Sequence, residues 1–258
     1  MARHEDALRA IGGDRLVMIE TPPRKFVLVE IANVSRRDLR QLRAFGGKAH
    51  QLPRDWLARF QRAGKTQPLR IGARLLIAHE MRDDALIIPA GAAFGTGDHA
   101  TTAMSLRLLE RVSRKLPRGW RMLDLGTGSG IFALAAKKFG AGKVIAIDFD
   151  ARAIATARKN ARANKIRGVQ FSIADALTFR AHGKFEIASA NLYSELLVEV
   201  LPRIANRLAP GGHAILSGVL RGQERAVCRA IAKAHLRMLV VRRRGKWIAL
   251  LVIPSAAA

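Results

Sequence analysis

The chain has 258 residues, 49% of them hydrophobic, so it can bury one sizeable core with a small second domain beside it. Its 45 Lys and Arg against 20 Asp and Glu give a formal net charge of +25, which predicts a polyanionic partner such as nucleic acid or a ribonucleoprotein. The single cysteine, Cys228, excludes a disulfide framework and a thiolate zinc site and fits a reducing cytosol. No apolar run approaches the roughly 18 residues of a membrane span, and residues 1–6 lack the apolar core of a secretory signal. We therefore expect a cytoplasmic protein with no membrane contact.

Residues 1–52 are predicted to form a small α+β domain. Two β runs, at residues 15–20 and 26–31, flank a turn whose prolines end both ladders, which indicates a hairpin. Ser35 and Asp38 have the spacing of a capping box and predict the start of a short amphipathic helix. We regard this domain as a candidate for substrate recognition.

Residues 53–88 are predicted to connect this domain to a larger one, with a short helix around residues 56–60 and strands near residues 74–78 and 85–88. In residues 89–258, helical stretches alternate with short apolar runs, a pattern typical of strands that are buried on both faces of a parallel sheet. The runs lie at residues 120–125, 143–148, 169–174, 185–190 and 213–217, and a final hairpin is predicted at residues 236–242 and 246–253, turning at Arg244-Gly245. The fold class is therefore predicted as α/β and Rossmann-like, with a mostly parallel seven-stranded sheet.

A glycine turn follows the first of these runs and contains Asp124, Gly126 and Gly128. Glycines at the start of a helix let the backbone turn tightly and approach a ligand, whose anionic part can meet the free N–H groups. The dinucleotide fingerprint would need a glycine where Ile131 stands, which disfavours NAD. Asp148 ends the next apolar run, where an acid can accept both hydroxyl groups of a ribose. Together these features predict an adenosine-containing ligand.

Two further polar residues follow apolar runs and belong to the same predicted crevice. Asp175 is placed to accept a hydrogen bond from an adenine amino group, although a solvated loop acid is nearly as good an interpretation. Asn191 is placed to face the reacting group, and its alternative is a simple turn residue. His99, in a long loop of small residues that runs into a helix, is interpreted as a capping or packing residue because no metal-ligand spacing surrounds it. In the same segment, a hydroxyl of Thr101 or Thr102 is a candidate contact to the amino-acid end of a cofactor.

These residues together resemble the bacterial methyltransferases that modify ribosomal protein L11, over about residues 53 to 253. The resemblance rests on the loop Phe94-Gly-Thr-Gly-Asp-His-Ala-Thr-Thr102, the turn Asp124-Leu-Gly-Thr-Gly-Ser-Gly130, Asp148, Ala190-Asn191-Leu192, Leu216-Ser-Gly218 and Trp247. It implies a class I methyltransferase fold and S-adenosylmethionine as the cofactor. It also implies cofactor contacts by Thr102, Gly126, Asp148 and Asn191, and methyl transfer to an amine nitrogen of a ribosomal protein, with Asn191 beside the reacting atoms.

A methyltransferase acting on an RNA or DNA base is the alternative, which the net charge of +25 supports. The content of only 5% aromatic residues argues against it, and so does the position of Tyr193, two residues after Asn191 where the Asn-Pro-Pro-Tyr signature needs three. A stripe of cations at a spacing of four predicts one side of a helix, open either to ribosomal RNA or to solvent. Its members are Arg221, Arg225, Arg229, Lys233 and Arg237.

Overall fold

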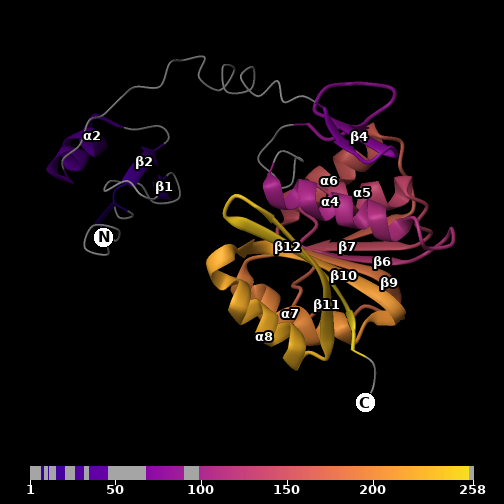
Figure 1. The fold of residues 1–258 in the computed structure, drawn as a ribbon. Helices are drawn as coiled ribbons and strands as arrows, with labels where there is room; N and C mark the ends of the chain where they lie inside the picture. Colours follow the sequence, from indigo (N-terminus) through magenta and orange to yellow (C-terminus); the bar gives the residue numbers. More distant parts are fainter. Residues whose placement is uncertain are drawn as a thin grey trace. The chain divides into compact units, whose positions relative to one another are not determined.

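The computed structural model describes residues 7–8, 11, 16–20, 27–31, 35–45, 68–89 and 99–255 (Figure 1). The chain divides into two compact units, residues 1–59 and residues 60–258, and each unit is described by itself. In the described part of the chain, no helix combines the length and the apolar character that crossing a membrane would require.

The first unit contains the predicted hairpin and helix. Strand β1 (Leu16–Glu20) pairs antiparallel with β2 (Val27–Ile31). Helix α2 (Arg36–Leu42) begins at a complete capping box, in which the Ser35 hydroxyl accepts from the Asp38 N–H and the Asp38 carboxylate accepts from the Ser35 N–H. The capping box is thus confirmed, whereas the helix expected around residues 56–60 lies outside the described residues.

A small three-stranded sheet opens the described part of the second unit. Strand β4 (Leu75–Ala78) pairs antiparallel with β3 (Leu69–Ile71) and parallel with β5 (Leu86–Ile87). The strands expected near residues 74–78 and 85–88 are confirmed, and β3 is additional. The apolar side chains of this sheet share one core with helix α4 (Ala100–Ser113).

The main sheet has seven strands in the order β11-β12-β10-β9-β6-β7-β8, and only β12 runs antiparallel to the rest. This confirms the predicted α/β fold with a mostly parallel seven-stranded sheet. The strands are β6 (Met122–Leu125), β7 (Val144–Asp148), β8 (Val169–Ile173), β9 (Phe185–Asn191), β10 (Leu208–Leu220), β11 (Leu236–Arg244) and β12 (Trp247–Pro254).

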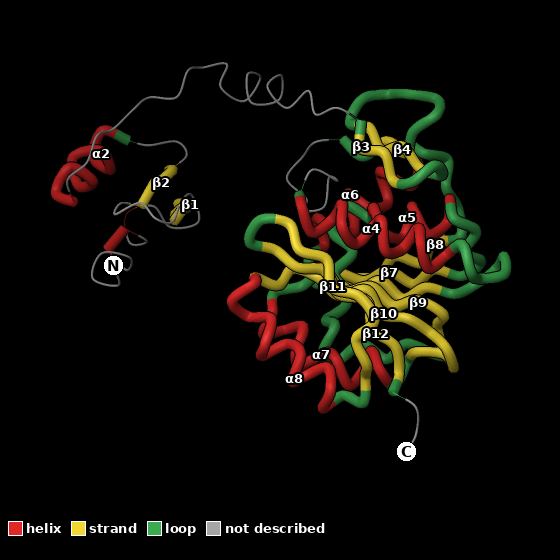
Figure 2. The backbone as a smooth tube through the Cα atoms, in the orientation of Figure 1, coloured by secondary structure: helices red, strands yellow, loops and turns green. Residues whose placement is uncertain are grey.

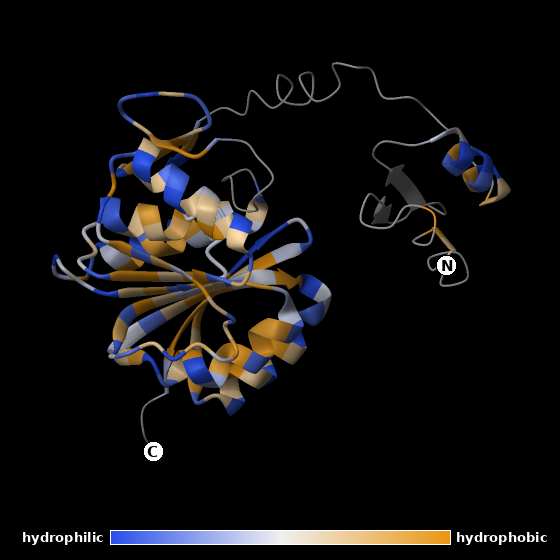
Figure 3. Cartoon of the chain, turned by 180° about the vertical axis from the view of Figure 1, so that it is seen from behind, coloured by the Kyte–Doolittle hydropathy of each residue, from blue (hydrophilic) through white to orange (hydrophobic). Residues whose placement is uncertain are grey.

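Helices cover both faces of this sheet (Figure 2). Alternate residues of one strand feed the two cores, since Val144 packs on one face and Ile145 on the other. The central strands are accordingly apolar along their length, as the hydropathy colouring in Figure 3 shows. The helices on one face are α4, α5 (Ile131–Lys138) and α6 (Ala151–Ala163), and those on the other are α7 (Ser194–Ala205) and α8 (Glu224–Lys233).

Two details of the C-terminal region differ from the sequence prediction. The final hairpin turns at Gly245-Lys246, one residue later than expected, because Arg244 still pairs with Trp247. The stripe of cations does not lie on one helix: Arg221 belongs to the 3₁₀ helix η3 (Arg221–Gln223), and Arg237 lies in β11. Helix α8 therefore carries only three of the five cations, all exposed: Arg225, Arg229 and Lys233.

Candidate functional site

The carboxyl edge of the parallel strands brings most of the predicted site residues together. Asp148 is the last residue of β7, and Asn191 is the last residue of β9. The glycine turn follows β6, which lies between these two strands, so Asp148 and Asn191 flank the turn. This edge of a parallel sheet is the place at which α/β proteins bind ligands.

The glycine turn has a backbone that other residues would not adopt easily. Gly126 and Gly128 have φ of 70° and 54°, and a Cβ atom added to Gly126 would lie 2.5 Å from the Leu192 Cδ2 atom. Glycine at position 126 therefore permits both the turn and the close approach of the segment that follows Asn191.

Asp148 ties the glycine turn to the end of β7. One of its carboxylate oxygens accepts the Gly128 N–H at 2.9 Å, and the other accepts the Asp150 N–H at 3.0 Å. The residue is 9% exposed, and each carboxylate oxygen can accept a second hydrogen bond. The carboxylate thus has the capacity to accept two further hydroxyl groups.

Asp124 lies behind the turn, and the hydrogen bonds to its carboxylate come from side chains of the protein itself. Its carboxylate accepts the Thr127 hydroxyl at 2.6 Å and also the Ser189 hydroxyl. Burial raises the pKa of Asp124 to about 6, and the two donated hydrogen bonds oppose that rise. The residue therefore joins the glycine turn to β9, which ends at Asn191.

Two buried oxygens near this edge lack a hydrogen-bond partner within the described structure: Thr102 Oγ1 and Asn191 Oδ1. An unsatisfied buried polar group costs about 1–3 kcal/mol, so both atoms fit a site that a ligand completes. Thr102 lies in the first turn of α4, and its side chain is fully buried.

His99 caps α4, as predicted. Its Nδ1 atom accepts the Thr101 N–H at 3.4 Å and lies 2.7 Å from the Thr101 hydroxyl oxygen. Its ring packs edge-on against Trp247, with 4.9 Å between the centroids. Burial and the nearby Lys246 ammonium lower the pKa of His99 and so favour the neutral form of the ring. Residues 90–98, which carry most of the distinctive loop, lie outside the described residues.

Asp175 is exposed, two residues beyond the end of β8. One of its carboxylate oxygens accepts the Leu177 N–H at 2.8 Å. This contact is that of an ordinary turn residue, and it leaves the second oxygen available to a ligand.

Three large exposed side chains lie at the same edge, and sequence reasoning missed two of them, Phe149 and Ile173. Phe149 is 79% exposed directly after Asp148, Ile173 is 59% exposed at the end of β8, and Tyr193 is 80% exposed after Asn191. Large apolar residues that gather at an edge, in place of polar loop residues, often mark a binding surface. For Phe149, the available signal was its place immediately after Asp148, the acid that ends a buried run.

A cavity of about 520 Å³ lies at the opposite edge of the sheet, where α4 and α5 end. Its Arg74 guanidinium donates to the Ser113 hydroxyl and to the Phe139 carbonyl, each at 3.0 Å. Cations at this place stabilise the carboxyl ends of helices, so the cavity has a structural explanation.

Comparison with known proteins gives consistent results. The family profile of ribosomal protein L11 methyltransferase (PrmA) matches residues 31–253. Three curated relatives are ribosomal protein L11 methyltransferases. Those from Symbiobacterium thermophilum, Bordetella parapertussis and Thermus thermophilus are 38%, 38% and 41% identical to this chain, over 72%, 80% and 64% of its length. The chain spans 62%, 70% and 63% of the length of these relatives.

Solved structures agree with this result. A ribosomal protein L11 methylase from Lactobacillus delbrueckii subsp. bulgaricus superposes with a TM-score of 0.64 at 27% identity, covering 73% of this chain and 98% of its own. An rRNA methylase from Streptococcus thermophilus, at 15% identity and a TM-score of 0.50 over 61% of this chain and 98% of its own, shares the fold alone. The profile match and the identities show that the chain belongs to the ribosomal protein L11 methyltransferase family.

Proposed function

We propose that this chain is a methyltransferase of the cytoplasm that uses S-adenosylmethionine to methylate amino groups of a ribosomal protein, either lysine side chains or an N-terminal amine. The proposal rests on the arrangement of residues at the carboxyl edge of the sheet, in a chain that belongs to this family. There the glycine turn lies between the Asp148 carboxylate and the Asn191 Oδ1 atom, which has no hydrogen-bond partner among the described residues. Family membership supports the ribosomal protein as the acceptor.

Residues at this edge have the chemistry that the cofactor requires. Asp148 would accept the ribose hydroxyl groups, while Gly126 and Gly128 let the backbone approach the ligand closely. The exposed Phe149 and Ile173 would flank the adenine ring, and the free carboxylate oxygen of Asp175 would accept from its amino group. The buried Thr102 hydroxyl would contact the amino-acid end.

Methyl transfer needs position more than a nucleophilic side chain. S-adenosylmethionine supplies a methyl group activated by its sulfonium. Asn191 Oδ1 would accept one N–H of the amine and so direct the nitrogen lone pair. Holding two reactants in line supplies roughly 7–11 kcal/mol. A lysine with a reference pKa of about 10.4 loses its proton at a cost of about 4–5 kcal/mol near pH 7, and solvent can remove it before the amine docks.

Two variants separate cofactor binding from transfer. Asp148→Ala should weaken S-adenosylmethionine binding by about 1.5–3 kcal/mol, because hydrogen bonds to a charged group are lost. Asn191→Ala should lower turnover about tenfold with a smaller loss of cofactor affinity, because its contact is made to the reacting amine. Calorimetry gives the affinity, and radiolabelled transfer into ribosomes, free ribosomal proteins and RNA gives both turnover and acceptor.

Asp150→Ala is the matched control for this experiment. The Asp150 side chain caps α6 through the Arg152 N–H at 2.8 Å, so its loss should leave cofactor affinity within about threefold. Unchanged affinity in folded Asp148→Ala protein would remove the ribose assignment. If nuclease digestion released the radiolabel and protease digestion did not, the acceptor would be RNA and not a protein.

We further propose that ribosomal RNA contacts the exposed side of α8 through Arg225, Arg229 and Lys233. Like charges at a spacing of four repel one another by a few tenths of a kcal/mol, so the helix gains no stability from them. Changing all three to Gln should flatten the salt dependence of ribosomal RNA binding by about 2–3 log units per log unit of salt. A slope equal to that of the unmodified protein would assign these side chains to solvent.

A further inference from the structure

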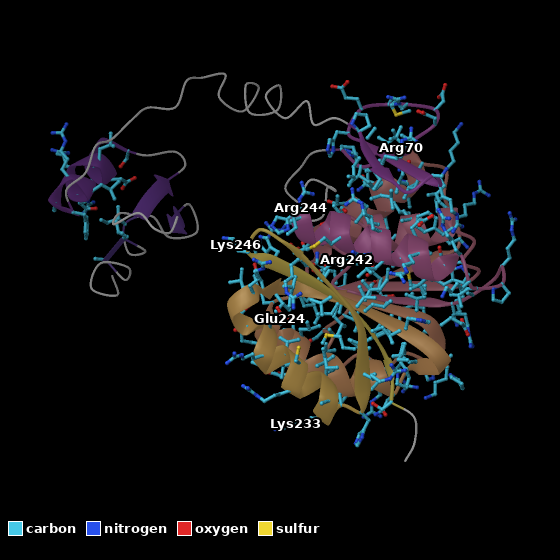
Figure 4. All side chains as sticks on the ribbon, in the orientation of Figure 1. Arg70, Glu224, Lys233, Arg242, Arg244 and Lys246 are labelled. Atoms are coloured by element: carbon cyan, nitrogen blue, oxygen red, sulfur yellow. The ribbon has the colours of Figure 1, made fainter. Side chains whose placement is uncertain are left out.

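Cationic side chains project from many parts of the second unit, in keeping with the net charge of +25 of the chain. Figure 4 shows them on β3 at Arg70, on β11 at Arg242 and on α8 at Lys233. A specific anion site therefore has to differ from this general positive surface in the number of its cations, in their pairing and in how firmly they are held. The cavity of about 520 Å³ where α4 and α5 end differs in all three respects.

Cations are concentrated around this cavity. Lys and Arg make up 45 of the 258 residues, or about one in six, so ten residues taken at random would include about two. Of the ten described residues that line the cavity, five are cations and none is a carboxylic acid. We call these five the amino-edge cluster, since they lie at the edge of the sheet opposite to Asp148 and Asn191: Arg74, Arg114, Arg118, Lys137 and Lys138.

The negative charge near the amino-edge cluster falls short of its positive charge. Each helix carboxyl end contributes about −0.5 elementary charge, so the ends of α4 and α5 together contribute about −1. Glu110 contributes one more negative charge and pairs with Arg114 at 2.7 Å. No other carboxylate of the described residues lies within ion-pair distance of the five cations. The cluster therefore keeps an excess of about three positive charges, beyond what the helix ends explain.

Arg74 is held in one orientation by its neighbours. Its guanidinium donates to the Ser113 hydroxyl and to the Phe139 carbonyl, each at 3.0 Å, and its Cζ atom lies 4.8 Å from the centroid of the Phe139 ring. The two hydrogen bonds use two of the five N–H groups of a guanidinium, so three remain for an anion. A planar cation that is already oriented suits the oxygens of a phosphate group, because less side-chain freedom is lost on binding.

The main chain that carries the other cations is also tied together. The Gly119 N–H donates to the Gly140 carbonyl, and the Gly142 N–H donates to the Trp120 carbonyl, each at 2.9 Å. A Cβ atom added to Gly142 would lie 2.8 Å from the Gly119 carbonyl oxygen, so the two loops pack with no side chain between them. The loop before β6, which carries Arg118, is thus joined to the segment that follows α5, and the cavity has preformed walls.

We propose that the amino-edge cluster binds a diphosphate group, either as inorganic pyrophosphate or as part of a nucleotide. Two phosphate groups carry about −3 to −4 near pH 7, which matches the excess of positive charge, whereas a single phosphate at about −1.5 to −2 leaves part of it. A nucleic-acid strand has one negative charge per phosphate, so it would have to bring about three phosphates into one cavity. The volume of about 520 Å³ lies within the range of roughly 300–1,000 Å³ for small-ligand sites. The inference goes beyond the proposed function, since it holds whether or not the chain methylates a ribosomal protein.

The test is calorimetry of the full chain with inorganic pyrophosphate, in about 50 mM salt and without divalent cations. The cluster variant changes Arg118 and Lys138 to Gln, two exposed cations that pair with no described carboxylate. The matched control changes Arg229 and Lys233 to Gln, which are exposed on α8, on the other face of the sheet. Both variants remove one arginine and one lysine, so an effect of total charge would appear in both. The thermal unfolding midpoint shows that each is folded, and the single variants replace a double variant that unfolds.

We expect the cluster variant to bind pyrophosphate at least about tenfold more weakly, because charge-assisted contacts to the anion are lost. The α8 variant should change the affinity by less than about twofold. Inorganic phosphate should bind the unmodified protein at least about tenfold more weakly than pyrophosphate, because it carries about half the charge. Equal losses in both variants, or no binding of pyrophosphate at about 1 mM, would overturn the proposal. Equal affinities for phosphate and pyrophosphate would also overturn it, since one phosphate would then suffice.

Two further ligands identify the source of the diphosphate. Uridine diphosphate is chosen because it lacks the adenine of the cofactor, so it does not report on the candidate site. Tighter binding of uridine diphosphate than of pyrophosphate, lost in the cluster variant, would support a nucleotide, and the reverse order would support pyrophosphate itself. If an RNA of about 12 nucleotides bound more tightly than either, with the same loss in the cluster variant, the cluster would be a nucleic-acid surface and the diphosphate proposal would be wrong.

Discussion

Replacing Gly218 with alanine is expected to lower the free energy of unfolding by about 2–5 kcal/mol and to abolish methyl transfer. Gly218 has a φ of 87°, and an added Cβ atom would lie 2.2 Å from the Leu192 carbonyl oxygen. Both the backbone strain and the overlap with main-chain atoms contribute, each costing about 1–3 kcal/mol. Since Leu192 follows Asn191 directly, relief of the overlap would move Asn191 out of its position.

Gly211→Ala separates strain from overlap, because Gly211 has a φ of 70° with no atom within 4 Å of an added Cβ. That control should lose only about 1–3 kcal/mol and keep its transfer rate. Urea unfolding and radiolabelled transfer measure the two effects. If Gly218→Ala were no less stable than Gly211→Ala and equally active, the contact between Gly218 and Leu192 would not hold Asn191.

Asp124→Asn is expected to change how stability depends on pH. The folded pKa of Asp124 is raised to about 6, mainly by burial, whereas the unfolded value is about 3.9. Well below the unfolded pKa, near pH 3 and lower, the carboxyl is protonated in both states. As the pH rises to 6 and above, the unfolded state releases the proton more easily, so the unmodified protein loses about 3 kcal/mol relative to Asp124→Asn.

Urea unfolding of both proteins at pH 3 and pH 7 measures this difference, because contributions that the two proteins share cancel in the comparison. Asp150→Asn is the control of opposite sign: hydrogen bonds, first of all from the Arg152 N–H, lower the pKa of Asp150. Asp150 therefore stabilises the fold above pH 4, and that contribution is lost as the pH falls. A constant difference between the unmodified protein and Asp124→Asn across this range would refute the raised pKa.

The features that sequence reasoning predicted correctly depend on local patterns. Strand β7 was evident because a buried strand is apolar at nearly every position, and Asp148 followed from its place at the end of that run. The capping box at Ser35 was likewise a short-range signal. These patterns need no knowledge of which segments meet in space.

The features that were missed depend on contacts between distant segments. The partners of Asp124 include Ser189, 65 residues away on a neighbouring strand, so its inward direction could not be read from the glycine turn. The need for glycine at position 218 arises from Leu192. The prediction that the five cations lie on one helix was wrong. Their spacing of four begins in η3 and continues into β11, and in a strand that spacing does not place residues on one side of a helix.

Strand β12 has a consequence for the order in which the protein is made. It is the last of the described strands along the chain, yet it lies inside the sheet between β10 and β11 and brings Trp247 against His99, the cap of α4. A nascent chain on the ribosome cannot complete this sheet until residues 247–254 have left the exit tunnel, because β11 has only β12 as its neighbour. The finished cap of α4 therefore forms only after residue 254 has emerged, and a growing chain exposes the flank of β10 throughout the synthesis of α8 and β11.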